Sequence, residues 1–245
     1  MIDLHNHILP GLDDGAAHLE ESLEIARRFV AEGVTQVAAT PHLNPMEGTG
    51  ARLPDVLEGV ARVRAALEGA GIPLDVVPGS EVYLTPDVPE LLGAGEIATL
   101  GGSRAVLVEL PFHGRPSYVE DVLEWIVAAG FTPVLAHPER SSWLAGDAGA
   151  VDWLLRREVP LQLTAAPLLG GYGSGIQRTA MSFLQGGAYS LAASDRHHPE
   201  QARSLADLHA AIAKATDEET ADLLLSENPA RLLAGEPVVR PTVVY

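Results

Sequence analysis

Short apolar runs alternate along the chain with segments in which apolar residues recur every three or four positions. The short runs predict β-strands, and the periodic segments predict amphipathic helices. Several runs, such as AVLVEL at 105–110, are apolar on both faces, which is typical of a parallel strand covered by helices on both sides. The seven predicted strands are 2–5, 36–40, 75–82, 105–110, 133–137, 160–164 and 190–194.

The helix signals lie between these strands. One apolar stripe runs along 19–30, and Gly33 follows it at a position where glycine commonly ends a helix. Pro54 suits the first turn of the next helix. Ser117 and Glu120 have the spacing of a capping box, which predicts that another helix begins there. Further helices are predicted around 151–157, 175–185, 201–214 and 218–225.

Repeated strand–helix units favour an α/β fold with right-handed crossovers and a parallel sheet. Seven units in 245 residues suit a barrel better than an open sheet, although periodicity alone does not decide between the two. The chain shows no low-complexity linker and no sustained internal repeat. We therefore expect a single domain over 1–245, in which 237–245 form a loose tail.

The charge balance restricts the partners of this chain. It carries 16 Lys and Arg against 33 Asp and Glu, a formal net charge of −17. Nucleic acids and anionic membranes both attract basic segments, so the acidity disfavours both partners. The N-terminus has no signal-peptide pattern, and no apolar run reaches the ~18 residues of a membrane-spanning helix. We expect a soluble, cytoplasmic protein that is not embedded in a membrane.

Histidine and carboxylate side chains follow the predicted strands where the strands end. His5 and His7 lie two residues apart on the first strand, so both imidazoles can reach one metal ion. By itself this spacing also fits two surface or capping histidines. Six of the seven strands end in this way, and only the strand that ends at Thr164 does not. The other members of the set are Asp13, Asp14, His42, Glu81, Glu109, His137, Asp195 and His197.

In a barrel, the carboxyl ends of all strands meet at one face, where barrel active sites lie. Asp14 before Gly15 can equally be part of a simple turn. Glu109 and His137 are harder to explain in that way, because they lie in the apolar contexts LVELP and VLAHP. Burying such a carboxylate is costly without a metal or a cationic partner. We therefore predict a metal centre, with coincidence at the strand ends as the alternative.

The residue types of this set restrict the metal. The chain has no cysteine, which excludes a Cys-ligated zinc, an iron–sulfur cluster, a disulfide scaffold and a thiol nucleophile. His, Asp and Glu without sulfur suit Mn²⁺, iron or Zn²⁺. Even nine of these side chains are too many ligands for one ion, and they predict a cluster of two or three divalent metal ions, which activates water and binds phosphoryl oxygens.

Two arginines lie close to these residues in the sequence. Arg140 is near the expected mouth of the site, where its guanidinium can bind phosphate through two hydrogen bonds. An ion pair with Glu139 is the alternative for Arg140. Arg196 lies between Asp195 and His197, and alternation along the strand points it away from the metal ions.

Eight motifs resemble, in order and spacing, the capsule and exopolysaccharide protein-tyrosine phosphatases of the bacterial PHP (polymerase and histidinol phosphatase) superfamily. The resemblance extends from residue 1 to about residue 236. It implies a distorted TIM-like (β/α)7 barrel, the PHP fold, with three metal ions that are often Mn²⁺. It also implies a partner, the tyrosine-rich tail of a membrane-bound tyrosine autokinase. The motifs are MIDLHNHILPGLDDG, ATPH, PGSEVY, LVELP, VLAHPER, LQLTA, AASDRHH and ENPARLLAG.

The resemblance divides the nine candidate ligands among three metal ions. Arg140 matches the phosphate-binding arginine of the family, and Arg140, Asp195 and His197 are the implied catalytic residues. Arg203 is the candidate for a second substrate-binding arginine, although its spacing after Asp195 departs from the family pattern. The segment APLLGGYGSG also lacks a basic residue that relatives carry before the aromatic. The implied ligands of the first, second and third ion are, respectively, His5, His7, Glu81 and Asp195; Glu81, Glu109 and His137; and Asp14, His42 and His197.

The predicted reaction is hydrolysis of phosphotyrosine by a metal-activated hydroxide, with Arg140 stabilising the developing charge. The first alternative is a phosphoesterase that uses the same site on a small molecule resembling histidinol phosphate. An amidohydrolase would need a metal-bridging lysine, whereas the one lysine of this chain, Lys214, lies far downstream. The third alternative is a metal-binding regulatory domain without activity, against which the nine filled ligand positions argue.

Overall fold

A computed structural model describes residues 1–242 and contains all seven predicted strands. The strand predicted over 75–82 is broken at Gly79 and Ser80. The strand predicted over 36–40 is followed, after Pro41, by a further short strand. The strands are β1 (Ile2–Asn6), β2 (Gln36–Ala39), β3 (His42–Asn44), β4 (Thr49–Gly50), β5 (Asp75–Pro78), β6 (Glu81–Tyr83), β7 (Ala105–Glu109), β8 (Thr132–Ala136), β9 (Leu161–Thr164) and β10 (Leu191–Ala193).

The strands form two sheets, ordered β1-β2-β5 and β10-β9-β8-β7-β6-β3-β4. Every pair is parallel except β3 with β4, so the prediction of a parallel α/β fold is confirmed. The closed (β/α)7 barrel is not confirmed, because no sheet within residues 1–242 closes on itself. The local cause lies where β2 and β5 end. Pro41 has no amide hydrogen for a ladder, and Gly79 adds no side chain to pack.

The two sheets meet at β1 and β10. The backbone N–H of His7 donates to the carbonyl oxygen of Arg196 at 2.8 Å, and that of Asp195 donates to His5 at 2.9 Å. The Arg196 side chain points away from the carboxyl ends of the strands, as alternation predicts. Its Nη2 lies 2.6 Å from Glu32 Oε1, and its guanidinium carbon lies 5.0 Å from the Phe29 ring centroid.

The buried pair of Arg196 and Glu32 gives a stability prediction. We expect Glu32→Ala to lower the free energy of unfolding by about 3 kcal/mol, because Arg196 is then left as a buried unpaired charge. Denaturant titration measures this. The double variant Glu32→Ala/Arg196→Met removes both charges and should recover most of the loss. A single-variant loss below about 0.5 kcal/mol, typical of a surface substitution, would contradict the prediction.

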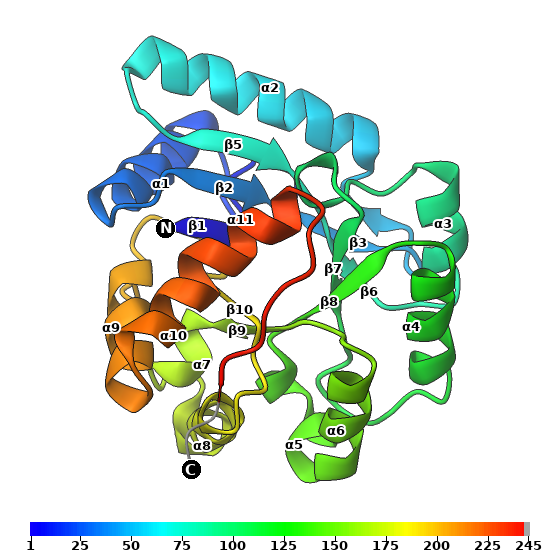
Figure 1. The fold of residues 1–245 in the computed structure, drawn as a ribbon. Helices are drawn as coiled ribbons and strands as arrows, with labels where there is room; N and C mark the ends of the chain where they lie inside the picture. The colour runs from blue at the N-terminus through cyan, green and yellow to red at the C-terminus, as the bar shows by residue number, and fades with distance from the viewer. Residues whose placement is uncertain (243–245) are drawn as a thin grey trace.

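Helices surround the two sheets (Figure 1), as the strand–helix pattern predicts. The short helices α3, α5, α7 and α11 were not predicted, because so few turns carry no clear apolar period. One-turn 3₁₀ helices lie at Leu100–Gly102 and Pro138–Arg140, and a π-helical turn lies at Leu223–Glu227. The helices are α1 (Leu19–Ala31), α2 (Leu53–Ala70), α3 (Val88–Ala94), α4 (Val119–Ala128), α5 (Ser142–Gly146), α6 (Ala148–Arg156), α7 (Ala165–Leu168), α8 (Gly173–Gln185), α9 (Leu205–Ala215), α10 (Glu218–Asp222) and α11 (Asn228–Leu233).

The predicted helix ends have mixed outcomes. Gly33 follows α1 with φ +83°, and Pro54 lies in the first turn of α2, as predicted. The predicted capping box of Ser117 and Glu120 is wrong, because α4 begins at Val119 without a side-chain cap. The Glu120 carboxylate instead pairs with the neighbouring guanidinium of Arg115, at 2.8 Å.

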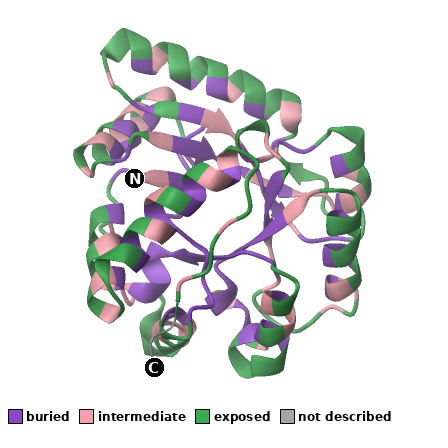
Figure 2. Cartoon of the chain, viewed as in Figure 1, coloured by how far each residue is buried: buried purple, intermediate pink, exposed green. Residues whose placement is uncertain are grey.

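Buried residues concentrate in the strands and on the inner faces of the helices (Figure 2). The prediction that AVLVEL is apolar on both faces is confirmed in β7. Val106 and Val108 belong to the large core, whereas Leu107 belongs to a smaller one. Leu232 of α11 packs into this smaller core. None of the described helices combines the length and apolar character that a membrane crossing requires.

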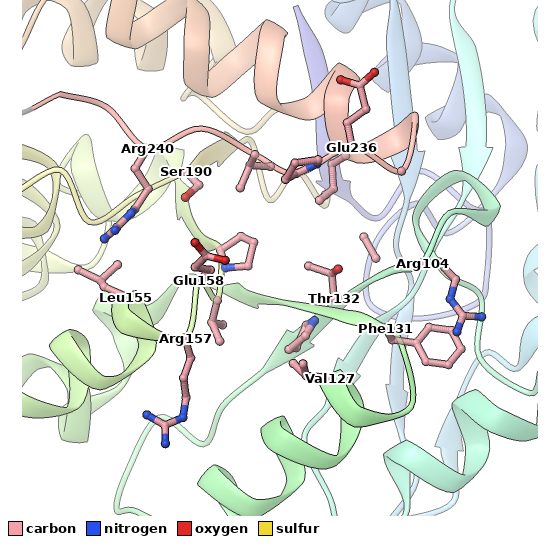
Figure 3. Close-up of a pocket in the computed structure, with 18 residues that line it drawn as sticks. Arg104, Val127, Phe131, Thr132, Leu155, Arg157, Glu158, Ser190, Glu236 and Arg240 are labelled. Carbon is pink, nitrogen blue, oxygen red and sulfur yellow. The ribbon is translucent and has the colours of Figure 1, made fainter.

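A cavity of about 550 Å³ lies where β7 to β10 begin, and the segment 235–240 passes beside it (Figure 3). The guanidinium groups of Arg104 and Arg157 point away from its centre. They bind the carbonyls of Ala129 and Gly130, and the carboxylate of Glu124. None of the predicted ligands lines this cavity.

The predicted tail over 237–245 is only partly described. Val239 N–H donates to Asn228 Oδ1 at 2.8 Å, and Asn228 Nδ2 donates back to the carbonyl oxygen of Val239 at 2.6 Å. These bonds attach the first part of the tail to α11. Residues 243–245 lie outside the described part of the chain.

Candidate metal and phosphate site

The carboxyl ends of the strands surround a second cavity, of about 660 Å³. The structure brings all nine predicted ligands together in its wall or directly beneath it. They form four overlapping groups, in each of which the donor atoms lie within 4.8 Å of one another. The groups are His7, Asp14, His42 and His197; His5, His7 and Glu81; His5, His137 and Asp195; and His42, Glu81 and Glu109.

His5 lies on β1 and His7 directly follows it, and the extended backbone points both imidazoles to the same side, as predicted. Both side chains are fully buried. His5 Nδ1 lies 2.8 Å from Gln162 Oε1, and His7 Nδ1 lies 2.6 Å from Asp13 Oδ2. Because these oxygens accept hydrogen bonds, Nδ1 of each neutral imidazole carries the proton. Each Nε2 then keeps its lone pair for a metal ion.

Glu81 begins β6 and is almost completely buried among histidines. Its Oε2 lies 3.1 Å from His5 Nε2 and 3.0 Å from His42 Nδ1. Its Oε1 lies 2.9 Å from His137 Nε2. Burial opposes ionisation, but the histidines outweigh it and hold the pKa of Glu81 well below its usual range. Glu81 is therefore ionised, and both of its oxygens face histidines that are also predicted metal ligands.

Glu109 ends β7 beside this group, with its Oε1 3.8 Å from His137 Nε2. Burial and the nearby charge of Glu81 raise the pKa of Glu109. The raised pKa reflects the cost of burying an ionised carboxylate at this position. That cost is the reason why Glu109 was predicted to bind a metal. A divalent cation between Glu81 and Glu109 would offset that cost.

Asp14, His42 and His197 lie at the outer edge of the cavity. The Nε2 atoms of both histidines are 3.5 Å from Asp14 Oδ1. The His197 ring stacks on His7, with 3.9 Å between the ring centroids. Burial and the neighbouring His7 lower the pKa of His197, which favours the neutral imidazole that a metal ligand requires. Asp14 is 69% exposed, so this group is the most open to solvent.

The residues present fit a cluster of divalent cations. His5 Nε2, His7 Nε2 and Glu81 Oε2 are buried without a hydrogen-bond partner, which is uncommon unless water or an ion completes them. The electrostatic field of the buried carboxylates also favours a positive charge at this place. Burial disfavours protonation of His5, but Glu81 and Asp195 outweigh it and raise the pKa of His5 to about 9. Nitrogen and oxygen donors without sulfur suit Mn²⁺, iron and Zn²⁺.

Two of the predicted ligands have a left-handed backbone. His137 has φ +32° and Asp195 has φ +53°. Such conformations cost about 1 kcal/mol or more for residues with side chains and cluster at functional sites. His137 directly follows β8 and Asp195 lies two residues after the end of β10, and both side chains line the cavity. The bond from Asp195 N–H to the His5 carbonyl helps to hold this geometry.

Asp13 orients His7 and also accepts the backbone N–H of His42 at 3.0 Å. We expect Asp13→Asn to weaken metal affinity about 10- to 100-fold, the usual cost of losing a hydrogen bond to a metal-bound histidine. Isothermal titration of the metal-free protein with Mn²⁺ measures this. Asp152 on α6, outside the cavity, serves as the control aspartate, and Asp152→Asn should leave the affinity unchanged. Equal affinities in both variants would contradict this role of Asp13.

Arg140 lines the same cavity, as predicted. Its Nη1 lies 3.5 Å from Asp195 Oδ2, and its guanidinium carbon lies over the rings of Phe112 at 4.1 Å and Tyr172 at 4.6 Å. The alternative ion pair with Glu139 is absent. The Glu139 carboxylate turns inward instead, where it accepts the hydroxyl of Tyr189 at 2.9 Å. Arg140 is therefore available to an anion.

Arg203 also lines the cavity, and its Nε donates to the carbonyl oxygen of Leu169 at 3.4 Å. A side chain at Gly171 would meet the Arg203 guanidinium carbon at 3.0 Å. Arg203 therefore occupies the space that a longer residue at position 171 would take. The family pattern is altered in two ways here, by the spacing of Arg203 and by glycine at position 171 where relatives carry a basic residue. Both changes affect the same small volume of the cavity wall.

Sequence reasoning missed several residues that support the site. Gln162 is polar within the apolar run LQL of β9, so the strand that was expected to contribute nothing orients His5. Asp13 belongs to the predicted strand-end set, but its role in orienting His7 is not predicted. Glu139 was considered only as a partner for Arg140, although it is almost completely buried and also accepts from Thr164. An isolated polar residue in an apolar run was the available signal for Gln162.

The chain also matches a known protein family along almost its entire length. The sequence model of capsular polysaccharide synthesis proteins, CpsB/CapC, matches residues 1–234. The chain belongs to the CpsB/CapC family. The motifs that carry the resemblance and the cavity that they form thus belong to a member of that family.

Named relatives of this CpsB/CapC protein are tyrosine phosphatases. It is 32% identical over 199 residues to tyrosine-protein phosphatase YwqE of Bacillus subtilis, covering 81% of this chain and 78% of YwqE. It is 27% identical over 240 residues to tyrosine-protein phosphatase CpsB of Streptococcus agalactiae, covering 95% and 98% of the two chains.

A solved structure is also similar to this CpsB/CapC protein. It comes from work on YwqE of Bacillus subtilis and CpsB of Streptococcus pneumoniae, described as metal-dependent tyrosine phosphatases. The TM-score is 0.91 at 29% identity, and the match covers 98% of this chain and 97% of the other. The similarity therefore includes both the strands and the segments that connect them.

Proposed function

We propose that this CpsB/CapC family member is a metal-dependent phosphatase that hydrolyses phosphotyrosine on a protein. One observation carries the proposal: a single cavity joins four groups of His, Asp and Glu donors to the guanidinium of Arg140. Cations in the donor groups, together with Arg140, give the cavity the positive charge that a phosphate requires. The tyrosine phosphatase activity named for YwqE and CpsB supports the same substrate class.

We assign the ligands to three ions as the family resemblance implies. The distances around Glu81 support its place between the first two groups. When bound, such ions activate water as a nucleophile and neutralise charge on the phosphoryl oxygens. We propose Mn²⁺ as the native ion, with iron or Zn²⁺ as alternatives, because carboxylate ligands suit Mn²⁺. The residues proposed to hold the first, second and third ion are, respectively, His5, His7, Glu81 and Asp195; Glu81, Glu109 and His137; and Asp14, His42 and His197.

The protein's own groups bind and orient the phosphate. Arg140 donates in-plane hydrogen bonds to phosphoryl oxygens and stabilises the charge that develops as the bond to tyrosine breaks. Asp195 and His197 bring ligand atoms to the side of the cavity that Arg140 faces. The tyrosine oxygen has a pKa of about 10 when free, so it leaves with less help from a proton donor than an alkyl alcohol does. The chain has no cysteine, so no thiol takes part.

Further proposals concern the setting of this reaction. We propose a bacterial tyrosine autokinase with a phosphorylated tail as the partner, and the cytoplasm as the location. We also propose that the strands form one distorted barrel in a single domain over 1–245. The backbone bonds between β1 and β10 support the barrel, because they join the edges of the two sheets.

The second candidate is a phosphoesterase for small alkyl phosphates that uses the same ligands and Arg140. The amidohydrolase alternative loses support, because Lys214 lies on α9 and does not line the cavity. The two phosphatase candidates differ only in the leaving group, so substrate comparison separates them.

The test strips the protein of metal, restores Mn²⁺, Fe²⁺ or Zn²⁺ separately, and assays three substrates. We expect a phosphotyrosine peptide to be hydrolysed at least about tenfold faster than a phosphoserine peptide or an alkyl phosphate, since the phenolate is the better leaving group. Activity confined to the alkyl phosphate would overturn the proposed function in favour of the second candidate. If none of the substrates were hydrolysed with any of the metals, a regulatory domain without activity would be favoured.

A further inference from the structure

Two aromatic side chains enclose Arg140 at the mouth of the cavity. Phe112 and Tyr172 are 37% and 46% exposed, respectively. Of the large apolar side chains exposed in residues 1–242, these two are the ones that line the cavity. Phe112 follows β7, whereas Tyr172 lies between α7 and α8, so the fold brings them together from distant parts of the sequence.

The guanidinium carbon of Arg140 lies over both rings, 4.1 Å from the Phe112 ring centroid and 4.6 Å from that of Tyr172. The N–H donors of arginine lie in the plane of the guanidinium. One of these donors, Nη1, lies 3.5 Å from Asp195 Oδ2. Arg140 thus packs on the two rings and at the same time reaches a predicted metal ligand, so a phosphate bound to Arg140 would lie close to both.

From this arrangement, and resting on the proposed function, we propose that Phe112 and Tyr172 select aryl phosphates by stacking on the ring of the leaving group. A phosphate held at the edge of Arg140 places its ester substituent at the cavity mouth. A phenyl ring there contacts the exposed parts of Phe112 and Tyr172, whereas a short alkyl chain does not reach them. Aromatic pairs of this kind favour offset or edge-to-face contact.

Both rings are held in place by their surroundings. The carbonyl oxygen of Phe112 accepts the N–H of Ser142, at 2.9 Å, which ties its loop to α5. On the other side, Gly171 N–H donates to the Ala166 carbonyl at 2.6 Å. Arg203 donates to Leu169 in the same loop. Arg203 thus supports the loop that carries Tyr172.

The experiment compares phenyl phosphate with ethyl phosphate in the metal-loaded enzyme. We expect Phe112→Leu and Tyr172→Leu each to lower kcat/KM for phenyl phosphate by about tenfold, and that for ethyl phosphate by less than about threefold. Tyr172→Phe keeps the ring and should retain the wild-type ratio. Trp125→Leu, an aromatic that is 51% exposed on α4 and outside the cavity, is the matched control and should change neither value.

Binding gives a second readout that does not depend on turnover. Calorimetry should show that Phe112→Leu weakens phenylphosphonate about tenfold and leaves methylphosphonate within about threefold. Equal losses for aryl and alkyl compounds would overturn the proposal, since they would mean that the rings only hold Arg140. Unchanged values would overturn it too. A wild-type enzyme that hydrolyses no aryl phosphate would instead overturn the proposed function.

Discussion

Replacing His5 or Asp195 by alanine should remove nearly all turnover of a phosphotyrosine peptide. We expect kcat to fall by at least about 10³-fold in each variant, because several kcal/mol of transition-state stabilisation depend on the bound cations. His5 contacts both Glu81 and Asp195, at 3.1 and 3.4 Å, so its loss affects more than one donor group. Steady-state assays in metal-replete buffer, with metal analysis of the same samples, measure the effect.

The control for these variants is His209→Ala. His209 lies on α9 and pairs with Asp222 at 2.9 Å, away from the cavity, so its replacement should leave turnover unchanged. Circular dichroism establishes that each variant is folded. Unchanged turnover in folded His5→Ala or Asp195→Ala would show that these residues do not hold catalytic metal.

Replacing Arg140 should give the second largest loss. We expect Arg140→Met to lower kcat by about 10²- to 10³-fold, the usual cost of removing one donor that stabilises developing charge. Methionine keeps much of the side-chain length, so Phe112 and Tyr172 still have a neighbour to pack against. Arg140→Lys keeps the charge but loses the paired donors and the flat stacking surface. Its activity should therefore lie between that of the wild type and that of Arg140→Met.

Metal content distinguishes Arg140 from the ligands. Arg140→Met should bind as much metal as the wild type, whereas His5→Ala should bind less, and inductively coupled plasma analysis shows the difference. Arg203→Met should lose less activity than Arg140→Met, because Arg203 contacts the loop at Leu169. If Arg140→Met retained wild-type kcat, the phosphate-binding role of Arg140 would be wrong.

Local patterns were sufficient to predict the seven main strand segments and the residues that the structure brings together at the site, but not the short strands β3 and β4. A candidate ligand at a strand end is predicted from two adjacent sequence features, an apolar run and the polar residue that follows it. Thus Glu109 after AVLV and His137 after PVLA were predicted individually, and the parallel arrangement placed them together. That they bind metal stays a prediction.

Features that depend on distant pairs could not be predicted from the sequence. The break at Pro41 and Gly79 depends on how β2 and β5 meet their neighbours, and it separates two sheets where a closed barrel was expected. The inward turn of Glu139 depends on Tyr189, fifty residues away. The stacking of Arg140 between Phe112 and Tyr172 likewise needs loops that approach only in the folded chain.

The most direct measurement of the central claim is titration of the metal-free protein with Mn²⁺, following bound metal and phosphotyrosine hydrolysis in the same samples. We predict that the stripped protein is inactive and that activity rises with occupancy until about two to three ions are bound per chain, the number that the clustered donors can hold. Full activity in the stripped protein, or full metal occupancy without phosphotyrosine hydrolysis, would contradict the claim.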